Sequence, residues 1–127
     1  MMIRIGLFVV SSCVCACTHL GATPPIKDLC NIRLSQTVRF SDLSVRAITD
    51  RHGSYLLIDA CPDHTVSVDF SQSDLYTERY KDLLKQMRVN AFQGGNPIRM
   101  KISGTYTGSD GKDIPATVVV DKILEYE

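Results

Sequence analysis

The apolar residues of the first predicted strand change parity part-way along it. They stand at even positions up to Phe40 and at odd positions from Leu43 onward. Successive side chains of a strand point to opposite faces, so one unbroken strand keeps its apolar residues at a single parity. One extra residue at Ser41–Asp42 reconciles the two halves. The sequence therefore predicts one long first strand with a β-bulge or bend at that point.

Alternation of apolar and polar residues predicts four more strands. We expect them at residues 55–60, 66–70, 98–106 and 116–126. The first of these four segments is apolar on both faces, so we expect it to lie centrally in the sheet. The last one shifts its apolar face between Val120 and Ile123.

The segment between the third and fourth predicted strands has the pattern of an amphipathic helix. Ser71 or Ser73 can cap its start, and Gly94–Gly95 with Pro97 can end it. One apolar stripe follows spacings of three and four residues, and its members are Tyr76, Tyr80, Leu83, Leu84, Met87 and Ala91. We expect this stripe to pack into the core.

The order of three strands, one helix and two strands resembles the OB-fold, a small Greek-key barrel. The resemblance covers roughly residues 35–126 and rests on the order of the elements. It implies a mainly β fold, a five-stranded barrel with one helix between strands 3 and 4. The alternative is an α+β domain with an antiparallel sheet and one packed helix. Closure of the sheet would protect its strand edges.

The start of the chain has a secretory signal pattern. Arg4 is the only charged residue before Lys27, and a short apolar run follows it. About twenty apolar residues are needed to span a bilayer as a helix. We therefore expect a cleaved signal here and no permanent membrane helix.

The tetrapeptide Val14–Cys15–Ala16–Cys17 resembles the lipobox of bacterial lipoproteins, in which an aliphatic residue and two small residues precede a cysteine. The resemblance implies that Cys17 becomes the lipidated N-terminus of the mature chain. A cut before Cys13 is one alternative, and an ordinary cleaved signal without lipid is another.

The implied anchor divides the chain into three parts. Residues 1–16 are the signal peptide, 17–27 are the lipidated start and a tether, and 28–127 are the OB-like domain. Thr18 follows the anchoring cysteine, whereas an Asp there tends to retain such proteins in the inner membrane. We therefore expect a lipid-anchored protein of the bacterial cell envelope, in the outer membrane and facing the periplasm.

The five cysteines divide between the signal, the lipid anchor and one remaining pair. Cys13 and Cys15 leave with the signal and Cys17 takes the lipid, so Cys30 and Cys61 remain. In an oxidising compartment such a pair predicts a disulfide, worth roughly 3–4 kcal/mol for a loop of this length. A metal or redox site is the alternative, but no CxxC spacing supports it.

The balance of charges and the absence of known catalytic motifs argue against some classes of function for this chain. The chain has 14 basic and 14 acidic residues, and loss of the signal removes one cation, Arg4. This balance argues against a general polyanion binder, so nucleic acid is not an expected ligand. The sequence holds no GxSxG, HExxH or phosphate-binding glycine loop. We therefore expect neither an enzyme nor a bound metal or cofactor.

The expected function is a non-catalytic binding module for an envelope protein or a small ligand. OB-folds bind through the face of strands 2 and 3 and the adjoining loops. The resemblance therefore implies a ligand-binding set made of His52, Tyr55, Asp59, Asp110 and Lys112. One alternative is a structural subunit of an envelope transport or secretion assembly. Another is a small hydrolase or nuclease that uses Asp59, Asp63 and His64.

Overall fold

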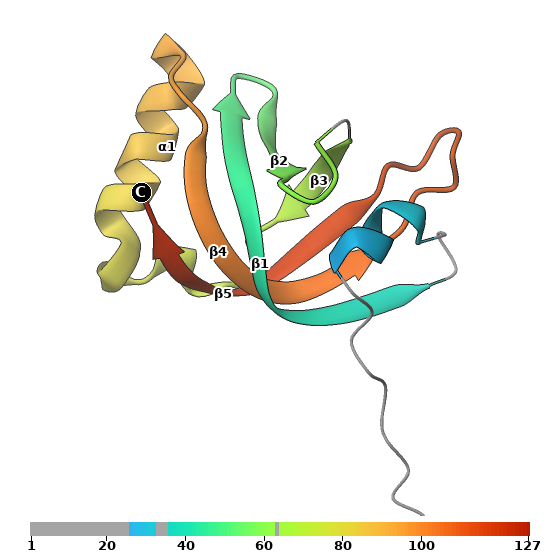
Figure 1. Ribbon diagram of the computed structural model, residues 1–127. Coiled ribbons are helices and arrows are strands. Elements are labelled where there is room, and N and C mark those ends of the chain that lie inside the picture. Colours follow the sequence, from blue (N-terminus) through green and yellow to red (C-terminus); the bar gives the residue numbers. More distant parts are fainter. Residues whose placement is uncertain (1–25, 33–35, 63) are drawn as a thin grey trace, which may run out of the picture.

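The part of the chain that the structure describes folds into a closed barrel of five strands with one α-helix. The computed structural model describes residues 26–32, 36–62 and 64–127. The strands follow the order β1-β2-β3-β5-β4 around the barrel (Figure 1). Their bounds are β1 Thr37–Asp50, β2 Gly53–Ile58, β3 Thr65–Asp69, β4 Ile98–Thr107 and β5 Thr117–Tyr126.

Helix α1, Lys81–Gln93, lies between β3 and β4 in the chain. The predicted OB-fold-like barrel is therefore confirmed. The alternative of an antiparallel sheet is wrong, because β3 pairs with β5 in parallel and this pairing closes the barrel. The predicted signal, Cys13 and the predicted lipidation site Cys17 lie outside the described residues.

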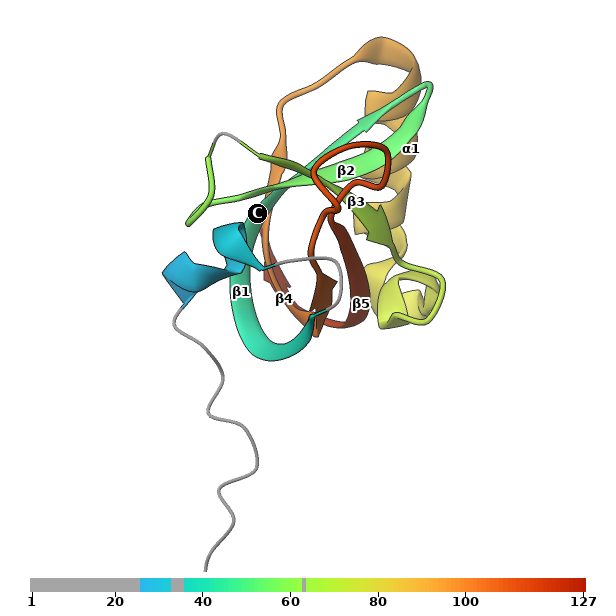
Figure 2. The same ribbon diagram turned by 90° about the vertical axis from the view of Figure 1, so that its right-hand side faces the viewer.

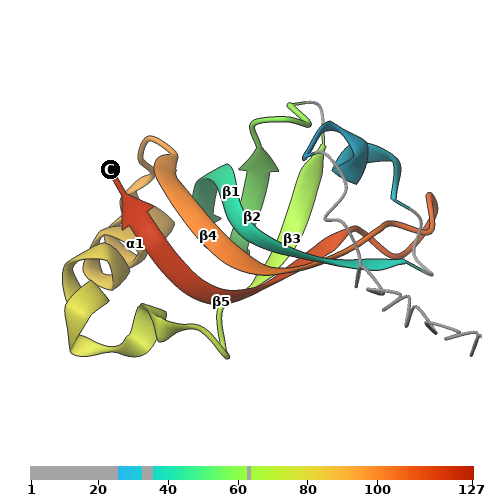
Figure 3. The same ribbon diagram turned by 60° about the horizontal axis from the view of Figure 1, so that its bottom comes forward.

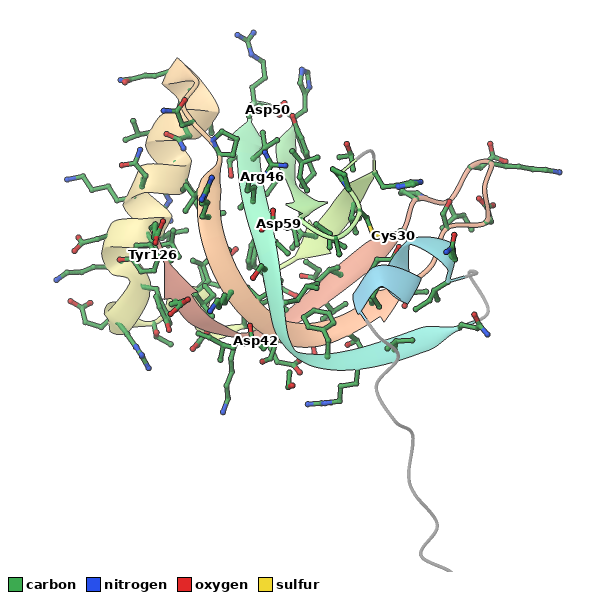
Figure 4. All side chains as sticks on the ribbon, in the orientation of Figure 1. Cys30, Asp42, Arg46, Asp50, Asp59 and Tyr126 are labelled. Carbon is green, nitrogen blue, oxygen red and sulfur yellow. A yellow bond between two sulfur atoms is a disulfide. The ribbon has the colours of Figure 1, made fainter. Side chains whose placement is uncertain are left out.

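The predicted bulge in β1 is confirmed by its pairing with β4. Phe40 lies opposite Gly104, whereas Leu43 lies opposite Ile102, so β1 has one residue more than β4 in this interval. Figure 4 labels Asp42 at the bend of the long strand. The extra residue lets both halves of β1 direct their apolar side chains inward.

The shift of face predicted in β5 is confirmed in the same way. Gly104 pairs with Val120, and Ser103 pairs with Lys122, so Asp121 is the additional residue. Bulges of this kind bend a strand and increase its twist. A second additional residue of β5, Leu124, lies between the partners of Lys101 and Ile102. The bulge of β1 and both irregularities of β5 therefore lie opposite residues 101–104 of β4.

The inward positions of all five strands form one continuous apolar core. Strand β2 lies between β1 and β3, but in a closed barrel every strand lies between two others, so the expected central place of β2 does not distinguish it. The barrel residues of this core are Phe40, Leu43, Val45, Ala47, Leu56, Ile58, Val66, Ile98, Met100, Ile102, Tyr106, Val118, Val120 and Ile123. Burial of so many aliphatic side chains is the main favourable term for folding.

Helix α1 begins later than the sequence predicts. Two short 3-10 turns, η2 Asp74–Tyr76 and η3 Glu78–Tyr80, precede it, and Thr77 between them has an extended backbone. This break turns Tyr76 outward, where its side chain is 62% exposed, so its expected place in the stripe is wrong. Leu83 and Met87 of the helix are buried.

The two ends of the barrel are covered by different elements. Figures 1 and 3 show α1 at one end and the 3-10 helix η1, Ile26–Asn31, near the other. Leu29 of η1 is buried in the core. A disulfide joins Cys30 to Cys61, with 5.6 Å between their Cα atoms, as the sequence predicts. The element η1 begins at Ile26, within residues 17–27 that the sequence analysis assigns to the lipidated start and tether.

No helix in the described ranges has the length and apolar character needed to cross a membrane.

Candidate functional site

Three half-buried apolar side chains lie together on the outside of β1 and β2, where water-facing strands usually carry polar residues. They are Ile48 of β1 with Tyr55 and Leu57 of β2, and we call them the outer platform. Ile48 lies directly opposite Tyr55 in the register. Leu56 and Ile58 alternate with the platform residues and point into the core.

Charged residues border the outer platform in balanced pairs. Arg46 lies opposite Leu57, and its Nε is 3.4 Å from Oδ1 of Asp59 (Figure 4). On β4, Lys101 pairs with Glu125 of β5 at 3.0 Å. All four charged side chains are partly exposed, so each pair contributes little to stability.

A groove of about 350 Å³ extends from this border across β4 to the end of β5. Its described lining includes Asp59, Arg99, Lys101, Glu125 and Glu127. Arg99 has no salt bridge within the residues that the structure covers. The groove therefore offers positive and negative groups side by side.

The β1–β2 turn holds the platform tyrosine in place. The carboxylate of Asp50 accepts a hydrogen bond from the backbone N–H of His52 at 2.7 Å and another from the hydroxyl of Tyr55 at 3.2 Å. Burial raises the pKa of Tyr55, and the charge and hydrogen bond of Asp50 raise it further. Tyr55 is thus a neutral, oriented phenol at physiological pH.

We expect the substitution Asp50→Asn to lower the pKa of Tyr55 but to leave it above the ordinary value of 10.0. The substitution removes the negative charge that disfavours a second anion nearby, whereas the burial of the ring persists. An alkaline NMR titration of the tyrosine ring signals measures this shift.

Tyr106 is the internal control, because burial alone raises its pKa and Asp50 takes no part. A fall in the pKa of both tyrosines, or of neither, would contradict the role given to Asp50.

The predicted ligand-binding residues fall into three places. His52 and Tyr55 share the β1–β2 hairpin, and Asp59 lies at the far end of β2 beside Arg46. Asp110 and Lys112 belong to the separate β4–β5 loop.

Asp110 organises its own loop. One carboxylate oxygen, Oδ1, accepts hydrogen bonds from the backbone N–H groups of Lys112 and Ile114, at 2.8 and 2.9 Å. These bonds to the charged form lower the pKa of Asp110. The expected single set of five residues is therefore not assembled at one site.

The residues of the hydrolase alternative do not share one pocket. Asp59 lines the groove beside Arg99, whereas His64 lines a different pocket at the η1 end of the barrel. Asp63 lies outside the described residues. Across the described ranges, no three His, Cys, Asp or Glu side chains are grouped as metal ligands would be.

Sequence reasoning did not name the platform residues Ile48 and Leu57 as candidate contacts. It also did not name the charged residues beside them, which are Arg46, Arg99, Lys101 and Glu125. The signal for the platform was present in β2, which is apolar at both parities. That pattern was interpreted as burial on both faces, but in a barrel one face of every strand points outward.

No protein-family model, curated protein or solved structure matches this chain.

Proposed function

We propose that this protein is an envelope lipoprotein, anchored through Cys17, whose OB-like domain binds a protein partner without catalysing a reaction. The observation that carries the binding role is the outer platform on the exterior of β1 and β2. The anchor is supported by the lipobox-like residues 14–17. A domain that is tethered to the membrane and has an apolar outer surface can bind a partner protein and hold it at the membrane.

The chemistry of the surface favours a protein segment over a polyanion. Interfaces between proteins combine an apolar, often aromatic, centre with a polar rim. Here Tyr55 and its apolar neighbours form the centre, and the pairs Arg46–Asp59 and Lys101–Glu125 form a rim of both signs. A polyanion would need an excess of cations, which this rim lacks.

Site-specific photocrosslinking in living cells tests the proposal. The photoreactive residue p-benzoylphenylalanine is placed at Leu57 in the full-length chain, and the matched control carries it at Thr105. Thr105 is also a half-buried outer-face position, but it lies on β4 opposite Val119 and away from the platform. We expect one defined protein adduct from position 57 and none from position 105.

A second variant separates specific from accidental capture. Tyr55→Ala in the chain that carries the probe at position 57 should reduce the adduct about tenfold or more, since buried interface aromatics commonly contribute 2 kcal/mol or more. The binding role would be refuted by equal yields of adduct from positions 57 and 105. It would also be refuted if Tyr55→Ala left the yield of the adduct unchanged, or if no adduct formed. Mass spectrometry of the mature N-terminus tests the anchor separately. An unacylated residue 17 would refute the anchor and would leave the binding role untouched.

A further inference from the structure

A second pocket, of about 790 Å³, lies at the η1 end of the barrel and is separate from the outer platform. Figure 2 looks into this end and shows η1 and the β4–β5 loop there. The described lining comes from segments distant in sequence: η1 with the residue after it, residues 64 and 65 at the start of β3, Tyr106 of β4 and the β4–β5 loop. Representative residues are Ile32, His64, Asp110 and Pro115. Its volume lies within the range of small-molecule sites in proteins.

The wall of the pocket contains Tyr106 of β4, whose side chain is only 4% exposed. None of the hydrogen bonds between the described residues involves its hydroxyl, and no polar side-chain atom in this part of the structure is sealed from solvent without a partner. Tyr80, the other buried tyrosine, differs, because its hydroxyl donates to the backbone carbonyl of Ile123. The hydroxyl of Tyr106 can therefore form a hydrogen bond with a molecule that enters the pocket.

Asp110 supplies the formal charge of the pocket. It is the only Asp, Glu, Lys or Arg among the described lining residues. Its Oδ1 atom is occupied by two backbone N–H groups, and no hydrogen bond within the described ranges uses Oδ2. The same N–H groups lower its pKa, so the carboxylate stays ionised at neutral pH.

The remaining wall combines apolar and uncharged polar groups. Ile32, Pro115 and Ala116 contribute aliphatic surface, and the disulfide at Cys30 holds η1 beside them. The polar members are Asn31, His64, Thr65 and Ser109. A pocket with apolar walls and a few polar groups orients a ligand through the polar groups and gains affinity from the walls.

We propose that this pocket binds a small organic cation: an amine whose ammonium group pairs with Asp110, whose apolar body lies against Ile32 and Pro115, and whose second polar group meets the hydroxyl of Tyr106. This site is independent of the protein-binding role of the outer platform, so either can fail without the other.

Tyramine is a suitable probe, because it joins an ammonium group to a phenol through an apolar body. The mature chain in mild detergent is titrated by NMR with tyramine, and in parallel with 4-hydroxyphenylacetate, in which a carboxylate replaces the amine. We expect tyramine to bind with a Kd of about 1 mM or tighter and to shift the signals of Thr65, Ala116 and the β4–β5 loop. The carboxylate analogue should bind at least about tenfold more weakly, since it meets the like charge of Asp110.

Two variants locate the interaction. Asp110→Asn keeps an oxygen acceptor for the loop N–H groups but loses the charge, and it should weaken tyramine binding about five- to tenfold. The matched control Asp113→Asn changes a charge in the same loop outside the pocket lining, and it should leave the Kd unchanged. Tyr106→Phe removes the hydroxyl and keeps the aromatic ring, and it should weaken tyramine binding about threefold.

Three results would overturn the proposal. The first is no binding of tyramine up to about 10 mM, which corresponds to a negligible affinity. The second is equal affinity for tyramine and 4-hydroxyphenylacetate. The third is an equal loss of binding in Asp110→Asn and Asp113→Asn, which would indicate a general effect of loop charge and no specific contact.

Discussion

Gly104→Ala is expected to lower the free energy of unfolding by about 2–4 kcal/mol, the range of severe overpacking in a tight core. Gly104 is a buried residue of β4 at the place where the bulges of β1 and β5 meet that strand. A Cβ atom there would lie far inside van der Waals contact of the backbone carbonyl oxygen of Val119. The obstacle is backbone of a paired strand, so it cannot turn aside as a flexible side chain would.

Chemical denaturation followed by circular dichroism measures this loss. The matched control is Thr105→Ala, one residue further along β4 on the outer face, where the side chain is half-buried. Removal of an outer β-branched side chain should cost well under about 1 kcal/mol. Similar losses in the two variants would show that β5 can move away from Gly104, and that the close approach of the strands is not required.

Removal of the disulfide by the double substitution Cys30→Ala/Cys61→Ala is expected to destabilise the domain by about 3–4 kcal/mol in the chain-entropy model. The bond closes a loop with a sequence separation of 31 residues and ties η1 to the β2–β3 connection. Leu29, next to the bond, is buried, so release of η1 would also expose apolar surface to water.

Thermal unfolding with and without a reducing agent measures this contribution. Reductant should lower the melting temperature of the wild-type chain towards that of the double variant. The double variant is its own control, since reductant should not change its melting temperature. The disulfide would be contradicted if reductant left the melting temperature of the wild-type chain unchanged and a thiol reagent detected free thiols in that chain. A loss of tyramine binding on reduction would further link η1 to the pocket at that end.

The sequence predicted the course of individual strands well, because alternation is a local property. The parity change at Ser41–Asp42 and the shift between Val120 and Ile123 both mark real bulges. In each case the apolar residues can all face the core only if one residue is added. The helix end at Gly94 is equally local, since its φ of 70° favours glycine over other residues.

The start of the helix was harder to predict, because the same spacing fits several backbone paths. Tyr76 falls on the apolar stripe, yet the extended backbone of Thr77 separates it from the helix. Asp74 accepts a hydrogen bond from the backbone N–H of Ile123 in β5, a contact across the fold. Such a contact holds η2 against the barrel, and no periodicity along the chain reports it.

For the candidate site, too, the sequence predicts what a local pattern encodes, and it does not predict contacts between distant segments. His52, Tyr55 and Asp59 lie on or beside the outer surface as the OB-fold resemblance implied, because β2 itself places them there. Asp110 lies elsewhere, since the β4–β5 loop belongs to the η1 end of the barrel.

The sequence by itself determined the strands, their bulges, the cysteine pair and the order of elements, because each is written in the spacing of neighbouring residues. The tertiary structure decided the parallel pairing of β3 with β5, the outward direction of the platform residues and the pocket around Tyr106. Each of these depends on which distant segments meet when the sheet closes. That choice is made by the packing of the whole core, and no local pattern encodes it.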